Sequence, residues 1–388
     1  MRILCLTSSY PRYASDIAGR FVLEFCDHLA RCGHVVDVLT WSDAAVDDDF
    51  APINHCIERV RYAPSGLDTL FYGAGVPENL EQTPLKGVLV PAAMATMAAR
   101  LVQKVRARRN PYDVIVGHWL LPGGILARLC GKLLAIRSVV VGHSGGVHLL
   151  GQMPKPIARQ LARIVVDGAL TVPTAELRDK LCTFADARHA SVLPMGFEPP
   201  PVDQSAIKSE RVDWLCMGRH VPIKGFDVAI DAFSRARLHD GSNLHIAGDG
   251  PDRVLLEAQA RARPDIHFHG IVTGSQKSAL LARCGYYLLP SKTLPSGRHE
   301  GLPVSFLEAA SLGLIALSGP VPGIDVYLAR PELQRVAEGD VAAWSRAIER
   351  LSQLASKERA QLAQASREKV AHLAWPRLIK DWERVLFG

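Results

Sequence analysis

Short apolar runs recur along the chain, each followed by a longer segment whose apolar residues recur every three or four positions. The short runs are typical of buried strands, and the longer segments are typical of helices with one apolar face. In the first half we expect strands at Ile3–Leu6, Val35–Thr40, Val114–Gly117, Ser138–Val141, Ala169–Pro173 and Ser191–Leu193. In the second half we expect strands at Trp214–Met217, Leu244–Ala247, Ile266–His269, Tyr286–Leu289 and Leu314–Leu317. Strands that alternate with helices in this way predict α/β domains with mostly parallel sheets.

The alternation is interrupted near the middle of the chain. Pro199, Pro200 and Pro201 begin a polar stretch that continues to Arg211. Consecutive prolines disfavour both helix and sheet, so we interpret this stretch as a domain linker. It divides the 388 residues into two domains of ordinary size, which we predict at 1–198 and 199–375.

Composition supports ordinary globular domains. Hydrophobic residues make up 48% of the chain and charged residues 22%, which are typical values. We identify no apolar run long enough to span a bilayer, and the first apolar run is too short for a signal peptide. The eight cysteines are scattered without a C-x-x-C pair, which favours buried, reduced thiols in a cytoplasmic protein.

The charge is mildly basic, with a formal net value of +6. No basic cluster is interleaved with aromatic residues, so we do not expect nucleic acid as a partner. A mild positive charge suits an anionic substrate or an anionic membrane surface.

One predicted helix, within Thr83–Arg109, concentrates positive charge. Met94, Met97, Leu101 and Val105 fall on one face of it, and Arg100, Lys104 and Arg108 line another, with Arg106 and Arg109 close by. Two interpretations remain open. The charges can form a solvated face of a helix packed on the core, or a patch for anionic lipid headgroups or a lipid-diphosphate acceptor.

Two histidines follow directly after predicted strands. His118 comes after Val114–Gly117, and His143 comes after Ser138–Val141. Ligand-binding groups of α/β sheets gather at the carboxyl ends of the strands, so both histidines are candidate site residues. For each, the alternative is a histidine that only caps backbone groups.

The second half contains a candidate anion site. The predicted strand Trp214–Met217 leads into a glycine turn that carries Arg219 and Lys224, and a helix begins at about Phe226. Two cations beside a helix N-terminus favour a bound phosphate.

A second helix start lies further along, at Glu300-Gly301-Leu302-Pro303. A polar loop runs into it, and Pro303 suits the first helical position because its missing N–H costs nothing there. The unpaired N–H groups near Gly301 and Leu302 suit a phosphate. Glu300 and Glu308 can accept hydrogen bonds from sugar hydroxyls. The stretch therefore predicts a nucleotide-sugar site.

These residues resemble motifs of the retaining GT-B glycosyltransferases of family 4, also described as glycosyl transferases group 1. Glu300 and Glu308 are similar to the E-x7-E motif, and Gly218-Arg219 with Lys224-Gly225 is similar to the G-R-x(n)-K-G motif. His143 resembles the histidine of the H-G-S-D-type motif, although Gly145-Gly146 replaces its Ser-Asp pair. The resemblance implies a GT-B fold: two Rossmann-like domains with a cleft between them, the last helix, 376–388, packing back on the first domain.

The resemblance also implies a role for each candidate residue. Arg219 and Lys224 would clamp the diphosphate of the donor, and His143 would lie beside the reacting carbon of the sugar. The predicted substrate-binding residues are Gly19 against the diphosphate, Gly301 and Leu302 at the helix N-terminus, Glu308 at the ribose, Ile271 near the base and His118 at the acceptor. Glu300 would hold sugar hydroxyls. No metal and no cofactor are expected, since the cations supply the positive charge.

The resulting hypothesis is a retaining, metal-independent glycosyltransferase. Its donor would be a UDP- or GDP-sugar. Its acceptor would be a saccharide, namely a lipid-linked or cell-surface precursor. It would be cytoplasmic, with peripheral contact to the inner face of an anionic membrane. Two alternatives stay open: a GT-B nucleotide-sugar epimerase, and a non-catalytic nucleotide-sugar-binding subunit of a glycosyltransferase complex.

Overall fold

The computed structural model describes residues 1–14, 16–47, 49–64, 66–72, 76, 79, 83–107, 111–202, 211–239, 241–295 and 297–388. It divides into two compact units. Unit 1 comprises Met1–Gly196 with Trp375–Gly388, and unit 2 comprises Phe197–Ala374. The domain borders that we predict from the sequence, after residues 198 and 375, differ from these by two residues and by one. Arg108, Arg109 and most of the predicted linker lie outside the described residues.

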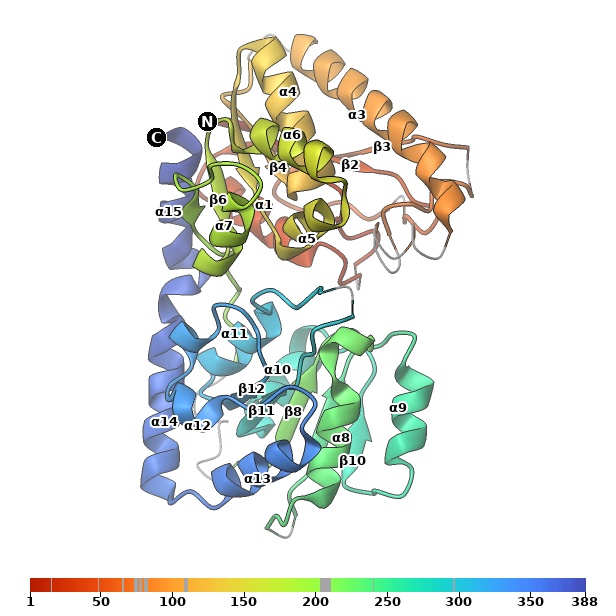
Figure 1. Cartoon of the computed structure of the whole chain (residues 1–388). Coiled ribbons are helices and arrows are strands. Elements are labelled where there is room, and N and C mark those ends of the chain that lie inside the picture. The colour runs from red at the N-terminus through yellow and green to blue at the C-terminus, as the bar shows by residue number, and fades with distance from the viewer. Residues whose placement is uncertain are drawn as a thin grey trace. The chain divides into compact units, whose positions relative to one another are not determined.

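Unit 1 is built on a parallel sheet, of which β2, β3, β4 and β6 are labelled in Figure 1. Its described strands follow the order β3-β2-β1-β4-β5-β6-β7. The strands are β1 (Arg2–Thr7), β2 (Val35–Trp41), β3 (Cys56–Val60), β4 (Val114–His118), β5 (Arg137–Val141), β6 (Leu170–Val172) and β7 (Ser191–Val192). The helices are α1 (Arg20–Arg31), α3 (Leu89–Arg106), α4 (Ile125–Leu134), α5 (Ser144–Gln152), α6 (Lys155–Val166), α7 (Ala175–Cys182) and α15 (Trp375–Phe387). Because the strands are parallel, their carboxyl ends share one edge of the sheet.

The central strands of unit 1 are apolar on both faces. Ile3, Leu4, Cys5 and Leu6 are all fully buried, as expected for a strand that helices cover on both sides. Leu4 and Leu6 belong to the core beneath α3 and α4, two helices that lie side by side in Figure 1. Near-continuous apolar runs rather than alternating ones are therefore the correct signal for this sheet.

The last helix, α15, packs against α1 of unit 1. Its apolar face is buried, and the ring of Trp382 meets that of Phe25 with centroids 5.1 Å apart. Glu383 accepts a hydrogen bond from His34 at 2.7 Å. The chain thus returns to unit 1 after it has completed unit 2, as the resemblance implies for 376–388.

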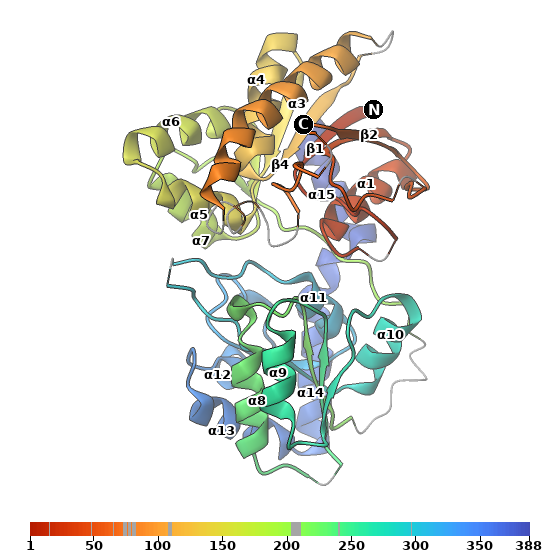
Figure 2. The same cartoon turned by 90° about the vertical axis from the view of Figure 1, so that its right-hand side faces the viewer.

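Unit 2 is built on a smaller parallel sheet with the described strand order β10-β9-β8-β11-β12. The strands are β8 (Trp214–Met217), β9 (Leu244–Ala247), β10 (Ile266–Phe268), β11 (Tyr286–Leu289) and β12 (Ile315–Ser318). The helices are α8 (Phe226–Arg235), α9 (Arg253–Ala260), α10 (Gly274–Arg283), α11 (Val304–Ser311), α12 (Pro331–Gln334), α13 (Val341–Ser352) and α14 (Ser356–Val370). Figure 2 shows α8 and α9 together on one side of the sheet, and α8 also packs against α13. The two parallel sheets with their covering helices confirm the predicted α/β fold class.

The structure corrects two expectations about helices. Pro303 does not occupy the first helical position: its extended backbone, with φ −77° and ψ 130°, makes it the residue before α11. The helical segment Leu85–Arg106 is long and apolar enough to cross a bilayer by length and composition, contrary to our expectation. A short 3-10 turn, Pro84–Val88, precedes α3 within this segment. Ala93, Met97 and Leu101 of α3 are nevertheless buried in unit 1.

The packing of α15 predicts a large effect of one substitution. Trp382→Ala should lower the free energy of unfolding by about 3 to 5 kcal/mol, because it removes a fully buried indole and leaves a cavity against Phe25. Urea unfolding measures the change. Arg377→Ala, at an exposed position of the same helix, is the control and should change stability by less than about 0.5 kcal/mol. A loss below about 1 kcal/mol for Trp382→Ala would show that α15 adds little to the stability of unit 1.

Candidate functional site

The centre of the candidate site in unit 2 is an ion pair between Lys224 and Glu300. Their side chains are only 14% and 11% exposed. The Ser291 hydroxyl donates a hydrogen bond to the second carboxylate oxygen of Glu300. Glu300 is therefore held from two sides, and two candidate residues that lie far apart in the sequence are in direct contact.

A glycine makes this contact possible. Gly225 has a φ of +64°, and a Cβ at this position would clash with the backbone carbonyl of Pro290. The start of α8 can therefore approach the loop after β11 only if residue 225 is glycine. The Lys292 N–H donates to the carbonyl oxygen of Ile223 at 2.8 Å and joins the same two segments.

Glu308, the second glutamate of the candidate site, also forms an ion pair. It lies within α11, is only 5% exposed, and accepts a hydrogen bond from Lys277 of α10 at 2.6 Å. A buried carboxylate is stabilised by such a partner, because burial of an isolated charge is costly. Lys277 carries no motif in the sequence, so sequence reasoning did not identify it.

Hydrogen bonds from Tyr287 fix the start of α11. Its hydroxyl lies 2.8 Å from the Ser305 hydroxyl and 3.2 Å from the carbonyl oxygen of Met217 at the end of β8. Burial raises the pKa of Tyr287 well above its ordinary value, so the hydroxyl stays protonated and can donate. These bonds connect the end of β8 with the helix that follows Glu300.

The remaining candidates of unit 2 lie at the same edge of the sheet. Arg219 is partly exposed and comes two residues after β8. Gly301 and Leu302, also partly exposed, precede α11, and Ile271 follows β10 with 45% of its surface exposed. Their positions at the carboxyl ends of parallel strands are those at which α/β proteins bind ligands.

In unit 1, the two histidines form a pair. His118 ends β4 and His143 follows β5, and their Nδ1 and Nε2 atoms lie 3.3 Å apart. The rings are stacked at an interplanar angle of 13°. His143 is partly exposed, whereas His118 is fully buried beneath it. The predicted contact of His118 with substrate is wrong for this structure, because the side chain does not reach the surface.

Burial controls the protonation of this pair. It lowers the pKa of His143 to about 3, and burial together with the neighbouring His143 lowers the pKa of His118 well below its ordinary value. Both rings are therefore neutral near pH 7. His143 can donate or accept a hydrogen bond at that pH, but it is not a proton-donating imidazolium.

Gly19 lies in the loop after β1 and immediately precedes α1. Its φ is +63°, and a Cβ would clash with the backbone oxygen of Ser9. Glycine at this position lets the loop fold closely over the end of β1.

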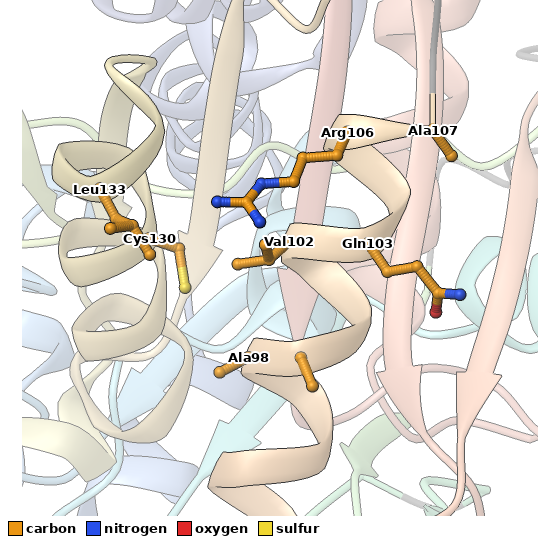
Figure 3. A pocket seen from close by; sticks show the side chains of 8 residues that line it. Ala98, Val102, Gln103, Arg106, Ala107, Cys130 and Leu133 are labelled. Carbon is orange, nitrogen blue, oxygen red and sulfur yellow. The ribbon is translucent and has the colours of Figure 1, made fainter.

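The basic stripe on α3 is partly neutralised. Arg100 and Lys104 both form ion pairs with Glu58 on β3. Arg106 instead borders a shallow hollow between α3 and α4, which Ala98, Val102, Cys130 and Leu133 also line (Figure 3). Two of the basic side chains on the described part of this helix are therefore paired within unit 1, and the lipid-patch interpretation stays a prediction.

Within the described residues, no group of three or more His, Cys, Asp or Glu side chains has the spacing to hold a metal ion. All eight cysteines are free, and Cys32 and Cys56 are exposed, so the expectation of buried thiols is wrong for these two.

Comparison with known proteins assigns the chain to a class. Residues 18–196 match the family described as "Glycosyl transferase 4-like domain", and residues 202–369 match "Glycosyl transferases group 1". The chain is a glycosyltransferase with the GT-B fold.

Three curated relatives have similar sequences. The WcaL protein of Escherichia coli K12, named for colanic acid biosynthesis, is 28% identical over 67% of this chain and 66% of its own length. The amylovoran biosynthesis glycosyltransferase AmsK of Erwinia amylovora is 27% identical over 72% of this chain and 73% of its own length. Glycogen synthase of Mycobacterium tuberculosis H37Rv is 27% identical over 84% of this chain and 79% of its own length.

Solved structures show the same fold at low sequence identity. Sucrose-phosphate synthase from Thermosynechococcus elongatus has a TM-score of 0.73 and 17% identity, with 99% of this chain and 98% of that chain covered. HepE from Anabaena, solved with UDP and glucose, has a TM-score of 0.71 and 14% identity, with 100% of this chain and 99% of that chain covered.

The histidine pair predicts a pH dependence of stability. In the unfolded chain a histidine binds a proton below about pH 6.5, whereas His143 in the folded chain does not until about pH 3. The free energy of unfolding therefore falls as the pH drops below about 6.5, by up to about 1.4 kcal/mol per pH unit for this residue. Between pH 6.5 and 5, the free energy of unfolding should fall by about 1 to 2 kcal/mol more in the wild type than in His143→Gln. Urea unfolding at both pH values measures the difference, and equal losses would contradict a neutral His143.

Proposed function

We propose that this glycosyltransferase moves a sugar from a nucleoside-diphosphate sugar to an acceptor with retention of the anomeric configuration. The observation that carries the proposal is the contact of Lys224 with Glu300 at the carboxyl edge of the sheet of unit 2, the edge at which Arg219 also follows a strand. Cations and a carboxylate in one place suit a ligand with a diphosphate and a hydroxylated ring. The E-x7-E spacing of Glu300 and Glu308 supports the same ligand.

The donor is a UDP- or GDP-sugar. HepE has been solved with UDP-glucose, and this relative in fold supports a uridine nucleotide without deciding the base for this chain. Ile271 lies in the loop that follows β10, where its backbone can meet the base. Glu308, held by Lys277, accepts hydrogen bonds from the ribose hydroxyls.

The chemical step depends on the charge of the departing diphosphate. Arg219, Lys224 and the backbone N–H groups near Gly301 and Leu302 stabilise the negative charge that develops on it. Gly19 of unit 1 stays a predicted contact of the diphosphate, on the motif resemblance alone. Lys224 must then exchange Glu300 for the phosphate, which leaves the Glu300 carboxylate to bind sugar hydroxyls. These cations take the place of a metal ion.

Retention requires the acceptor to attack on the face from which the diphosphate leaves. The leaving phosphate takes the proton of the attacking hydroxyl, so no protein nucleophile is needed. His143, neutral because of its burial, hydrogen-bonds the sugar near the reacting carbon. His118 supports His143 from below and acts as a positioning residue.

The acceptor is a lipid-linked or cell-surface saccharide precursor, and the protein acts at the inner face of an anionic membrane. The names of WcaL and AmsK, which refer to the biosynthesis of polysaccharides, support this acceptor class. The helical segment Leu85–Arg106 supports membrane contact, because only 17% of its most apolar stretch is buried. Leu85 and Val88 are 80% and 75% exposed.

A donor screen tests the proposed activity. Among UDP- and GDP-sugars without acceptor, one should bind and slowly release its nucleoside diphosphate, since water replaces the acceptor. Lys224→Ala and Glu300→Gln should each lower this rate by about 100- to 1,000-fold, as does loss of one charge-stabilising group in other enzymes. Lys357→Ala and Glu257→Gln, at exposed positions of unit 2, are matched controls that should retain the rate.

Three outcomes of the screen would favour another function. Near-wild-type rates in both site variants would contradict the assignment of the site. A free epimerised nucleotide sugar as product would identify an epimerase. Tight binding of a donor without turnover, with turnover restored by a partner protein, would identify a binding subunit.

Membrane contact can be tested separately. The double variant Leu85→Glu/Val88→Glu should bind phosphatidylglycerol vesicles at least tenfold more weakly than the wild type, because each apolar side chain contributes about 1.5 to 3 kcal/mol when buried. Vesicle co-sedimentation measures the partition. The matched control is Val254→Glu/Leu255→Glu, whose residues on α9 are similarly exposed. Equal binding of both double variants would contradict docking through this segment.

A further inference from the structure

Trp119 differs from the other tryptophans of the chain. Trp41, Trp214, Trp344, Trp375 and Trp382 are all almost completely buried. Trp119 alone among the six is partly exposed, directly after β4, at the edge of the sheet where His143 follows β5. Core packing accounts for the other five, but it does not account for an indole that reaches the surface at the candidate site.

The backbone of Trp119 is also unusual. Its φ of +62° and ψ of 142° lie in a region that side chains other than glycine rarely adopt. The conformation is held in place, because the Gly124 N–H donates to the Trp119 carbonyl oxygen at 2.8 Å. Glycine would relieve the strain at this position. A bulky residue kept in a strained backbone beside a candidate site indicates that its side chain is used.

The neighbours of Trp119 form a small aromatic group. Phe21, partly exposed in the first turn of α1, lies 5.8 Å from Trp119 and 5.2 Å from His143 between ring centroids. Trp119 and His143 are 4.8 Å apart. A Cβ added to Gly145, two residues after His143, would meet no atom within 4 Å, so space is open there. Two partly exposed aromatic rings, a neutral imidazole and open space therefore lie together within unit 1.

This combination matches the chemistry of a sugar ring. One face of a hexose is lined by C–H groups that pack well on an aromatic ring, while its hydroxyls need hydrogen-bond partners at the rim. Aromatic side chains supply the first, and the imidazole of His143 supplies the second. An indole also offers a large rigid surface and loses little conformational freedom on binding.

We propose that Trp119, with Phe21 beside it, forms a stacking subsite for a saccharide ring next to His143. The proposal rests on the glycosyltransferase function proposed above and names two further residues that determine its sugar specificity. The ring can belong to the acceptor or to the sugar of the donor, which present the same C–H face. The experiment separates these two sources.

Fluorescence provides a direct readout, because the other five tryptophans are shielded from a quencher. Acrylamide should quench a fraction of the wild-type emission, and Trp119→Phe should abolish that fraction. Methyl glycosides of glucose, galactose and mannose, and the corresponding UDP- and GDP-sugars, serve as probes. Protection by a free glycoside identifies an acceptor ring. Protection by a nucleotide sugar, with none by a free glycoside, identifies the donor ring.

Kinetics supply the second readout once diphosphate release has identified a donor. Trp119→Ala and Phe21→Ala should each raise the KM of the stacked sugar at least fivefold, with kcat changed less than KM. Trp119→Phe should keep the KM within threefold, since a ring is retained. Among the described residues, Ala135 at the C-terminal end of α4 is the other non-glycine residue with a positive φ, of 55°. Ala135→Gly is the control and should leave both constants unchanged.

The proposal is overturned if no probe protects Trp119 and both alanine variants keep their KM values within twofold of the wild type. If the wild type releases no diphosphate from any donor, the proposed function fails. Protection of Trp119 by free glycosides would still support the subsite in that case, and its absence would overturn the subsite as well.

Discussion

The candidate site depends on the ion pair of Lys224 with Glu300. Lys224 ends a short 3-10 turn, Pro222–Lys224, that follows β8, and Glu300 lies in the irregular segment between β11 and α11. Largely buried charges are stable only when they are paired and hydrogen-bonded, so the pair fixes both segments. Gly225 allows the approach, and the Ser291 hydroxyl satisfies the second oxygen of Glu300.

The same pair explains how the site can be formed before a donor binds. Without a ligand, each charge has the other as its partner, and a diphosphate offers Lys224 a stronger anion in the place of Glu300. The carboxylate is then released for the hydroxyls of the sugar. Lys277 and Glu308 form a comparable pair in α10 and α11. On the proposed function, the donor competes with these internal ion pairs, which favours a ligand that carries both a diphosphate and hydroxyl groups.

Sequence patterns could predict the fold and the main charged residues. Apolar runs predict most of the strands, and the motif resemblance groups Arg219, Lys224 and Glu300, of which Lys224 and Glu300 are in contact in the structure. The resemblance could not provide Lys277, because a lysine on an amphipathic helix has no signal until α10 is seen beside α11. Ser291 could have been found, since it comes two residues after β11 at the carboxyl edge of the sheet.

Other differences arise from the direction of side chains, which a linear pattern does not contain. A histidine at the end of a strand can point to solvent or into the fold, and the side chain of His118 is buried in the fold. Arg100 and Lys104 share one helix face in sequence, but only the structure places Glu58 of the neighbouring β3 between them. Trp119 cannot be identified from the sequence, because a positive φ has no sequence signal when the residue is not glycine.

Calorimetric binding of free UDP and GDP, which lack the sugar, tests most directly whether the Lys224–Glu300 pair competes with the diphosphate. For whichever nucleotide binds, Lys224→Ala should weaken binding relative to the wild type, because it removes a cation that the diphosphate uses. Glu300→Gln should strengthen binding of the same nucleotide, because Lys224 is released from its internal partner. Weaker binding in Glu300→Gln together with unchanged binding in Lys224→Ala would contradict this competition.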